Sequence, residues 1–237
     1  MGKDDKLPVR SSGQDIEAFV EQARRLPEKT DSGQRGRLVF ALDATASRQP
    51  TWDRACEIQG DMFLATDKLG GLDVQLCFYR GYGEFSVSPW YSSSSDLVRR
   101  MTSVFCLGGL TQIGKVLRHA LKEARKSKIN AVVFVGDCVE ENPDHLAHLA
   151  GQIGILGVPL FLFYEGRDPR TIRVFRQIAH LTRGAACPFD HASAEQLRDL
   201  LSAVAVYATG GWRALEQFSD GRHGSVKKLT QQLKPDR

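Results

Sequence analysis

The sequence lacks the long apolar runs of a membrane protein. No stretch approaches the ~18 consecutive apolar residues that a spanning helix needs. The charged amino terminus, residues 1–6, is followed by no hydrophobic segment of the kind found in a secretory signal. We therefore expect a cytoplasmic protein with no membrane partner.

Cysteine is scarce and scattered. The 5 cysteines form no Cys-x-x-Cys pair, and no paired histidine spacing accompanies them. Their odd number and wide spacing argue against a disulfide framework and against a structural zinc site, because both need matched pairs of thiols or ligands. We expect reduced thiols at all of these positions, namely Cys56, Cys77, Cys106, Cys138 and Cys187.

The charge balance is close to neutral. The 32 basic and 28 acidic residues of the 237-residue chain leave a net charge of only +4, and 42% of the residues are apolar. This composition is typical of one soluble globular domain with modest extensions. The sequence shows no basic stripe and no glycine-rich phosphate loop. We therefore expect no nucleic-acid partner.

Composition divides the chain into three parts. Residues 1–36 form a polar amino-terminal extension, in which one amphipathic helix is predicted from about residue 15 to residue 26. Residues 37–209 hold the apolar patterns of a folded domain. Residues 210–237 form a polar, mildly basic tail with too few apolar residues for a core of its own.

Strands and helices alternate through the domain. Continuous apolar runs at 38–42, 131–135 and 159–164 are typical of strands buried on both faces. Residues 74–79 and 84–87 flank a glycine-containing turn and predict a hairpin, and a short strand is expected near 187–189. Helices are expected from about 51 to the glycines at 70–71, around 97–101, from 111 through 121, and over 143–155, 169–181 and 194–207. The pattern predicts an α/β fold with a doubly wound, mostly parallel six-stranded sheet, one antiparallel edge strand and helices on both faces.

Oxygen-bearing side chains occur where three of these segments end. Ligands of open α/β sheets bind outside the carboxyl ends of the strands. Asp43, Thr45 and Ser47 alternate in the loop after the first strand, so all three can point the same way. Thr111 follows a Gly-Gly pair that the topology returns to this end, and Asp137 follows the strand at 131–135. We therefore expect these five side chains to converge.

Two carboxylates and three neutral hydroxyls suit a hard octahedral cation. Mg2+ or Mn2+ matches such oxygen ligands, whereas zinc and copper prefer nitrogen and sulfur. The sequence therefore predicts a divalent-cation site at Asp43, Thr45, Ser47, Thr111 and Asp137.

The order Asp-x-Thr-x-Ser, then Thr, then Asp resembles the metal-ion-dependent adhesion site of the von Willebrand factor A-type (VWA) domain, found in integrin inserted domains and in stand-alone bacterial proteins. Thr45 replaces the usual serine and keeps the hydroxyl. The resemblance implies a sheet order of 3-2-1-4-5-6. It also implies that Thr45, Ser47 and Thr111 bind the metal directly, with Asp43 and Asp137 acting largely through water.

The resemblance also implies a function. Domains of this family capture a carboxylate of a protein partner at the metal without turnover, and ligand capture can shift the last helix, here 194–207. We expect a non-enzymatic adaptor in an intracellular complex whose partner, of the ATPase or chaperone class, binds through an acidic residue.

Other interpretations stay open for single residues and for the whole chain. Thr111 alone could be a helix N-cap, Asp137 could cap a turn, and Glu140 and Glu141 could lie in a solvated loop. Asp43 could be the nucleophile of a haloacid-dehalogenase-like, Mg2+-dependent phosphatase, but no lysine stands in a recognisable position to steady the phosphate. The fold could also persist without its metal.

The sequence also indicates where a partner would make contact. The hairpin tip at 80–84, together with Arg48 and Trp52, is predicted to form the rim of the partner surface. Tyr82 offers a large contact of low conformational entropy there.

Overall fold

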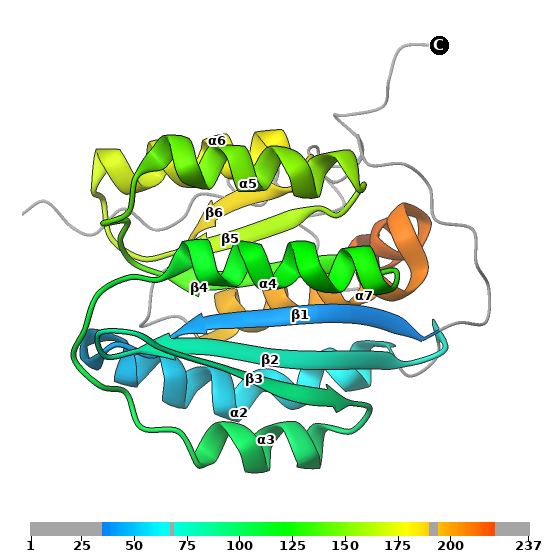
Figure 1. Ribbon diagram of the computed structural model, residues 1–237. Helices are drawn as coiled ribbons and strands as arrows, with labels where there is room; N and C mark the ends of the chain where they lie inside the picture. The colour runs from blue at the N-terminus through cyan, green and yellow to red at the C-terminus, as the bar shows by residue number, and fades with distance from the viewer. Residues whose placement is uncertain (1–34, 67–68, 190–193, 221–237) are drawn as a thin grey trace, which may run out of the picture.

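Six strands form one twisted sheet in the computed structural model, which describes residues 35–66, 69–189 and 194–220 (Figure 1). The strand order is β3-β2-β1-β4-β5-β6, and every neighbouring pair is parallel except β2 and β3. The strands are β1 (Gly36–Asp43), β2 (Leu72–Arg80), β3 (Glu84–Tyr91), β4 (Ala131–Gly136), β5 (Leu160–Tyr164) and β6 (Ala185–Pro188). The predicted fold class, sheet order and antiparallel edge strand are confirmed.

The central strands are apolar on both faces because helices cover both sides of the sheet. Residues of β4 and β5 are buried throughout. The helical elements are η1 (Ala46–Arg48), α2 (Gln49–Thr66), α3 (Ser94–Thr102), α4 (Ile113–Lys126), α5 (Pro143–Ile155), α6 (Pro169–Leu181) and α7 (Ala194–Asp220). The first core lies between the sheet and α2, α3 and α7, and the second lies between the sheet and α4, α5 and α6 (Figure 1).

The carboxyl ends of the parallel strands meet at one edge of the sheet, on the left in Figure 1. The helices α2, α4, α5 and α6 run back along the sheet, so the short η1 and the amino termini of these helices gather at this edge, and the carboxyl termini of α2, α4, α5 and α6 lie at the other. Asn142 and Asp168 begin α5 and α6 by accepting hydrogen bonds from backbone N–H groups of the first turn. The edge thus collects acidic and polar loop residues.

The carboxy-terminal part of the domain extends further than the sequence predicted. We expected the last helix to end at about 207 and the domain at 209, because the chain beyond turns polar with too few apolar residues for a core of its own. Instead α7 continues to Asp220 across a break at Gly211, whose φ of 68° is left-handed. Beyond the break, Leu215 is buried in the core.

The amphipathic helix predicted at 15–26 lies outside the described residues. Among the helices that the structure describes, none is both long enough and apolar enough to cross a bilayer.

Candidate metal centre

The loop after β1 holds three of the five predicted ligands in one turn. Asp43 is buried at the end of β1, and its Oδ1 accepts a hydrogen bond of 2.7 Å from the backbone N–H of Thr45. This bond turns the chain into η1. Thr45 Oγ1 and Ser47 Oγ then lie 3.5 Å apart, and Ser47 Oγ donates to Asp137 Oδ2 at 3.3 Å. The structure therefore brings Asp43, Thr45, Ser47 and Asp137 into one connected cluster.

Thr111, the fifth predicted ligand, joins this cluster indirectly. Its Oγ1 accepts a hydrogen bond of 3.1 Å from the backbone N–H of Glu140, and its own N–H donates to Glu140 Oε2 at 2.8 Å. Glu140 stands three residues after Asp137. Thr111 makes no hydrogen bond to the other four predicted ligands within the described chain. It is also not the N-cap of α4, which is Gln112, so the capping interpretation is wrong.

The two glutamates after β4 are not merely solvated, as the sequence had left open. Glu140 holds Thr111, and the Glu141 carboxylate accepts hydrogen bonds from the N–H groups of Ile113 and Gly114, the latter at 2.9 Å. A carboxylate is favourable at a helix amino terminus, where the N–H groups lack partners and the dipole is positive. Since the N-cap residue Gln112 makes no side-chain capping bond, Glu141 satisfies the N–H groups at the start of α4 in its place.

One oxygen of the cluster lacks a partner. Asp43 Oδ2 is buried and makes no hydrogen bond of good geometry among the described residues, and the buried Tyr79 hydroxyl near it also lacks a partner. Burial raises the pKa of Asp43, the hydrogen bonds from Thr45 and the nearby Tyr79 hydroxyl oppose this, and the charge of Asp137 adds to it. An unpartnered buried carboxylate oxygen is costly. A divalent cation among Asp43, Thr45 and Ser47 would provide the missing partner, so the donor set fits such an ion.

Arg48 is a part of the site that the sequence analysis placed wrongly. It was expected on an exposed rim, but it is buried, and its Nη1 lies 2.5 Å from Glu165 Oε2 and 3.5 Å from Asp137 Oδ2. Thr51 completes the network by accepting from Arg48 Nη2 at 2.7 Å and donating to Glu165 at 2.8 Å. Glu165 follows β5, so the pairing spans 117 residues and left no local signal.

Trp52 was also expected on the rim and is instead part of the core. Its ring is buried against Phe78, and its Nε1 donates to the carbonyl of Met101 at 3.0 Å. The physical reason is that Trp52 lies in the first turn of α2, and its side chain faces the core between this helix and the sheet.

Breaking the buried ion pair should destabilise the protein. We expect Arg48→Met to lower the free energy of unfolding by about 2 kcal/mol, because it leaves Glu165 and Asp137 without their cation in a partly dry site. Denaturant unfolding in EDTA measures this effect. Arg99→Met, on the exposed surface of α3, is the matched control and should change little.

The double variant Arg48→Met/Glu165→Gln tests the cause. It should recover about 1 kcal/mol relative to the sum of the single effects, because residue 165 then carries no unpaired charge and only Asp137 still lacks the cation. Strict additivity would show that Arg48 acts through packing alone.

The two cysteines nearest this end are not reactive groups at neutral pH. Burial raises the pKa of Cys106 to about 12 and that of Cys138 to about 11, and the neighbouring carboxylates act in the same direction. Both remain protonated thiols, which agrees with their interpretation as small packing residues.

An apolar surface lies beside the cluster. The β2–β3 turn and the loop from α3 to α4 are hydrogen-bonded to each other, since Gly81 N–H donates to Leu107 O at 3.3 Å and Leu110 N–H to Gly81 O at 3.2 Å. Leu107 N–H in turn donates to the carbonyl of Ala44, next to Asp43, at 2.9 Å. Only glycine fits at 109, because a side chain there would collide with the Gly81 backbone.

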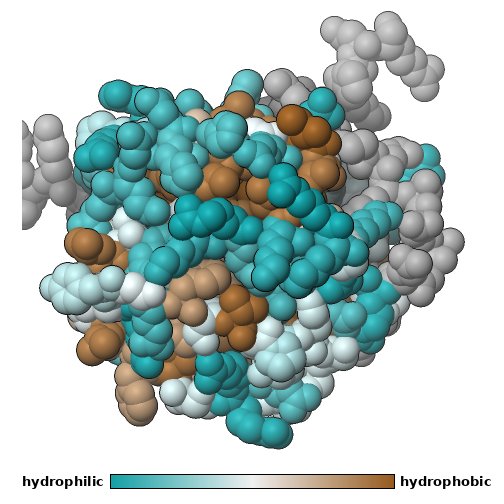
Figure 2. Space-filling model, in the orientation of Figure 1, coloured by the Kyte–Doolittle hydropathy of each residue, from teal (hydrophilic) through white to brown (hydrophobic). Residues whose placement is uncertain are grey.

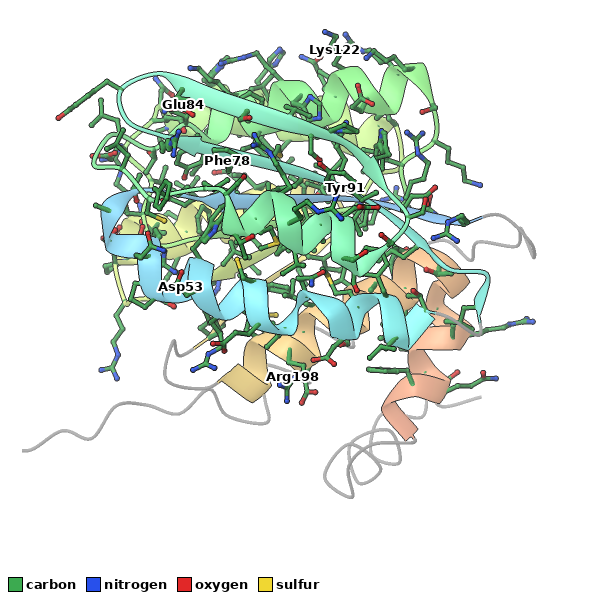
Figure 3. The ribbon with its side chains drawn as sticks, turned by 90° about the horizontal axis from the view of Figure 1, so that it is seen from below. Asp53, Phe78, Glu84, Tyr91, Lys122 and Arg198 are labelled. Atoms are coloured by element: carbon green, nitrogen blue, oxygen red, sulfur yellow. The ribbon has the colours of Figure 1, made fainter. Side chains whose placement is uncertain are left out.

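These two loops expose four large side chains, which we call the apolar rim. Tyr82 is 87% exposed and Phe105 is 75% exposed, and Leu107 and Leu110 are each at least half exposed. Figure 2 shows apolar side chains projecting at this end of the molecule, and Figure 3 shows Glu84 at the same hairpin. Adjacent exposed apolar residues are typical of interaction surfaces, whereas single ones are not.

Comparison with known proteins gives a fold and no close relative. No protein-family model matches the sequence, and no curated protein matches it either. Solved structures do match. A von Willebrand factor type A protein from Catenulispora acidiphila superposes with a TM-score of 0.58 and 19% identity over 73% of this chain and 43% of that chain. This chain therefore spans less than half of that protein's length.

Two further structures agree. The SpRpn10 VWA domain gives a TM-score of 0.54 at 13% identity, covering 71% of this chain and 94% of that domain. Proximal thread matrix protein 1 from the mussel byssus, with a zinc-occupied metal-ion-dependent adhesion site, gives 0.55 at 15% identity, covering 75% of this chain and 47% of that protein. With the strand order 3-2-1-4-5-6 and one antiparallel edge strand, the chain has the fold of a von Willebrand factor A-type domain.

Proposed function

We propose that the chain is a divalent-metal-dependent protein-binding module. The observation that carries this proposal is the position of the buried, unpartnered Asp43 oxygen, which lies among hydroxyl groups and next to the apolar rim. A cation site and an exposed apolar surface at the same edge together suit a protein partner that contributes both an acidic residue and large apolar side chains.

The proposed ligands divide by chemistry. Thr45, Ser47 and Thr111 would contribute neutral hydroxyl oxygens, and Asp43 and Asp137 would act largely through water. A divalent cation bound there supplies an electrophilic position that can take a carboxylate oxygen from a partner. Because neutral hydroxyls donate less charge than carboxylates, they leave the ion's attraction for an incoming anion largely intact.

The identity of the cation is a separate part of the proposal. We propose Mg2+ or Mn2+ from the all-oxygen donor set. The mussel protein of similar fold holds zinc in its adhesion site, which supports divalent binding in general. It also weakens the expectation that zinc fits such a site poorly, so zinc belongs in the titration.

The apolar rim favours a protein partner over a small ion or metabolite. Tyr82 and Phe105 are both large and mostly exposed aromatic side chains. A small molecule would leave most of their apolar surface in contact with water, whereas a protein partner could cover it. We propose an adaptor role in which the partner, of the ATPase or chaperone class, places an acidic residue at the metal and apolar residues on the rim.

The phosphatase alternative has less support. That chemistry needs a cation to steady a phosphate beside Asp43. Arg48 is the cation at this place, and it is already held by Glu165 and Thr51. Lys115, at the start of α4, donates to the carbonyl of Gly83 in the hairpin.

Affinity capture tests the proposed function. The full chain, immobilised with Mg2+ or with EDTA, is exposed to native lysate, and the eluted proteins are identified by mass spectrometry. Proteins that depend on both the metal and Asp43 support the proposal. An identical set of proteins with Mg2+, with EDTA and with Asp43→Ala would refute it.

The apolar rim should contribute to partner binding but not to the stability of the fold. Tyr82→Ala should weaken capture of a metal-dependent partner about tenfold, because it removes an exposed aromatic anchor. The melting temperature should stay within about 1 °C of the parent, because an exposed side chain contributes little to stability. Leu64→Ala, 73% exposed on α2, is the control and should change neither quantity. An equal fall in capture for both variants would count against the rim.

A further inference from the structure

The end of the molecule opposite the metal centre carries exposed aliphatic side chains. Helices α5 and α6 finish there, and they touch, since a side chain at Gly154 would collide with the Leu181 carbonyl. Ile155 is 86% exposed, and Leu156 and Leu181 are each more than a third exposed. We call these three residues the aliphatic tip. None of them belongs to the metal cluster or the apolar rim.

Cations lie at the same end of the molecule. The last two turns of α4 and α6, together with Arg183 two residues beyond α6, contribute Lys122, Arg125, Lys126, Arg176 and Arg183, all exposed. Arg125 Nη2 donates to Gln152 Oε1 at 3.1 Å, which joins the cations of α4 to the end of α5. Figure 3 shows Lys122 on the outer side of α4, pointing away from the sheet.

Acidic residues are concentrated at the other end. Asp144 and Asp168 lie at the starts of α5 and α6, near the metal centre. In the last turns of α4 the acid is Glu123, which is buried and paired with Lys126. Around the ends of α4, α5 and α6, the exposed charges of the described residues are therefore mainly basic. Cations at helix carboxyl ends offset the helix dipole, but this does not explain the exposed aliphatic residues.

Arg183 gives a second, independent observation. Its φ of 54° is left-handed, at the position after the α6 C-cap where glycine is usual. A side chain there carries a conformational cost that glycine would avoid. Arg183 occupies this position despite that cost, and its charge adds to the cations of α4 and α6.

We propose that this end of the molecule docks on the surface of an anionic lipid bilayer. Cations complement anionic headgroups, and the aliphatic tip complements the boundary of the acyl chains. Nucleic acid would match the cations but offers no apolar phase for Ile155, which is 86% exposed. The sequence-based expectation of no membrane partner rested on missing spanning and signal segments, which a surface contact does not need.

Docking would also orient the molecule. The tip lies at the amino ends of the strands, and the metal centre lies at the carboxyl ends. A docked chain would therefore hold its metal centre and apolar rim away from the bilayer, where a protein partner can reach them. The proposal goes beyond the proposed function and stands without it, because neither the metal nor the rim takes part in the contact.

Vesicle co-sedimentation of the full chain in EDTA tests the proposal. Vesicles of phosphatidylcholine with phosphatidylglycerol should bind the protein, vesicles of phosphatidylcholine alone should not, and raised salt should release it. Ile155→Ser should weaken binding about tenfold through lost aliphatic contact. Arg183→Gly should weaken it about fivefold through lost charge, while the melting temperature stays equal or rises because the left-handed position suits glycine.

The controls use exposed residues of the same kinds elsewhere. Leu64→Ser and Arg99→Gln, on α2 and α3, should bind as the parent does. Equal binding to both vesicle types, equal losses in the controls, or retention of RNA without retention of anionic vesicles would overturn the proposal. Vesicle binding that requires Mg2+ would also overturn the proposal, because the metal centre and not the aliphatic tip would then make the contact.

Discussion

Asp43→Ala should bind Mg2+ about a hundredfold more weakly than the parent while remaining folded. Asp43 is the one predicted ligand with a buried oxygen that lacks a partner, and its other oxygen fixes the turn that carries Thr45 and Ser47. Removing it takes away both a charge and the loop geometry. Loss of outer-shell partners alone costs about tenfold to a hundredfold in metal affinity. Calorimetric titration with Mg2+, Mn2+ and Zn2+ measures the effect.

Asp43→Asn separates the charge from the geometry. The amide keeps an acceptor for the Thr45 N–H but removes the negative charge. It should therefore lose most of the metal affinity and keep the fold. If Asp43→Asn bound Mg2+ as tightly as the parent, the carboxylate would have no role in the site.

The pH dependence of stability gives an independent check. Burial raises the pKa of Asp43 above its usual value. Without metal, the stability linked to this group is thus fully present below the ordinary aspartate pKa and is lost as the pH rises through the raised one. Asp43→Asn should remove this part of the slope. Saturating Mg2+ should reverse it, because the cation favours the ionised carboxylate.

The strands and helices were readable because their patterns are local. The apolar runs at 38–42 and 131–135 are short and continuous, which is typical of strands buried on both faces, and they pair in parallel at the centre of the sheet. The helices at 143–155 and 169–181 begin with an Asn-Pro and an Asp-Pro signal, and the structure places them at the same bounds. By contrast, the continuation of α7 past Gly211 depends on burial of Leu215, which the local sequence does not show.

The candidate site was predictable in its first loop and not in its supports. The alternate spacing of Asp43, Thr45 and Ser47 predicted that they lie on one turn. The position of Asp137 directly after β4 predicted that it lies near them. The contact of Arg48 with Glu165 and the capping of α4 by Glu141 join segments far apart in the chain. Such pairs leave no period or spacing in the sequence, so they required the three-dimensional arrangement.

Substitutions at Thr111 should separate its observed role from its proposed one. Its hydroxyl already accepts a hydrogen bond from the N–H of Glu140, which ties the start of α4 to the loop after β4. Thr111→Ser keeps a hydroxyl and should resemble the parent. Thr111→Val keeps the shape without the oxygen. It should lower the free energy of unfolding in EDTA by about 1 kcal/mol and, if Thr111 is a ligand, weaken Mg2+ binding about tenfold or more.

Two further variants of the series isolate the metal ligand. Thr111→Asn offers an amide oxygen that can accept from the Glu140 N–H, so it should recover part of the stability while its longer side chain misplaces the ligand oxygen. Thr102→Val, on α3, removes a hydroxyl that bonds within its own helix and is the matched control for loss of a threonine oxygen. Unfolding in EDTA and calorimetry with Mg2+ are measured for each. If Thr111→Val loses stability yet binds Mg2+ like the parent, the Thr111 hydroxyl only stabilises the loop through its hydrogen bond with Glu140. The cation site would then rest on Asp43, Thr45, Ser47 and Asp137, which the structure already brings together.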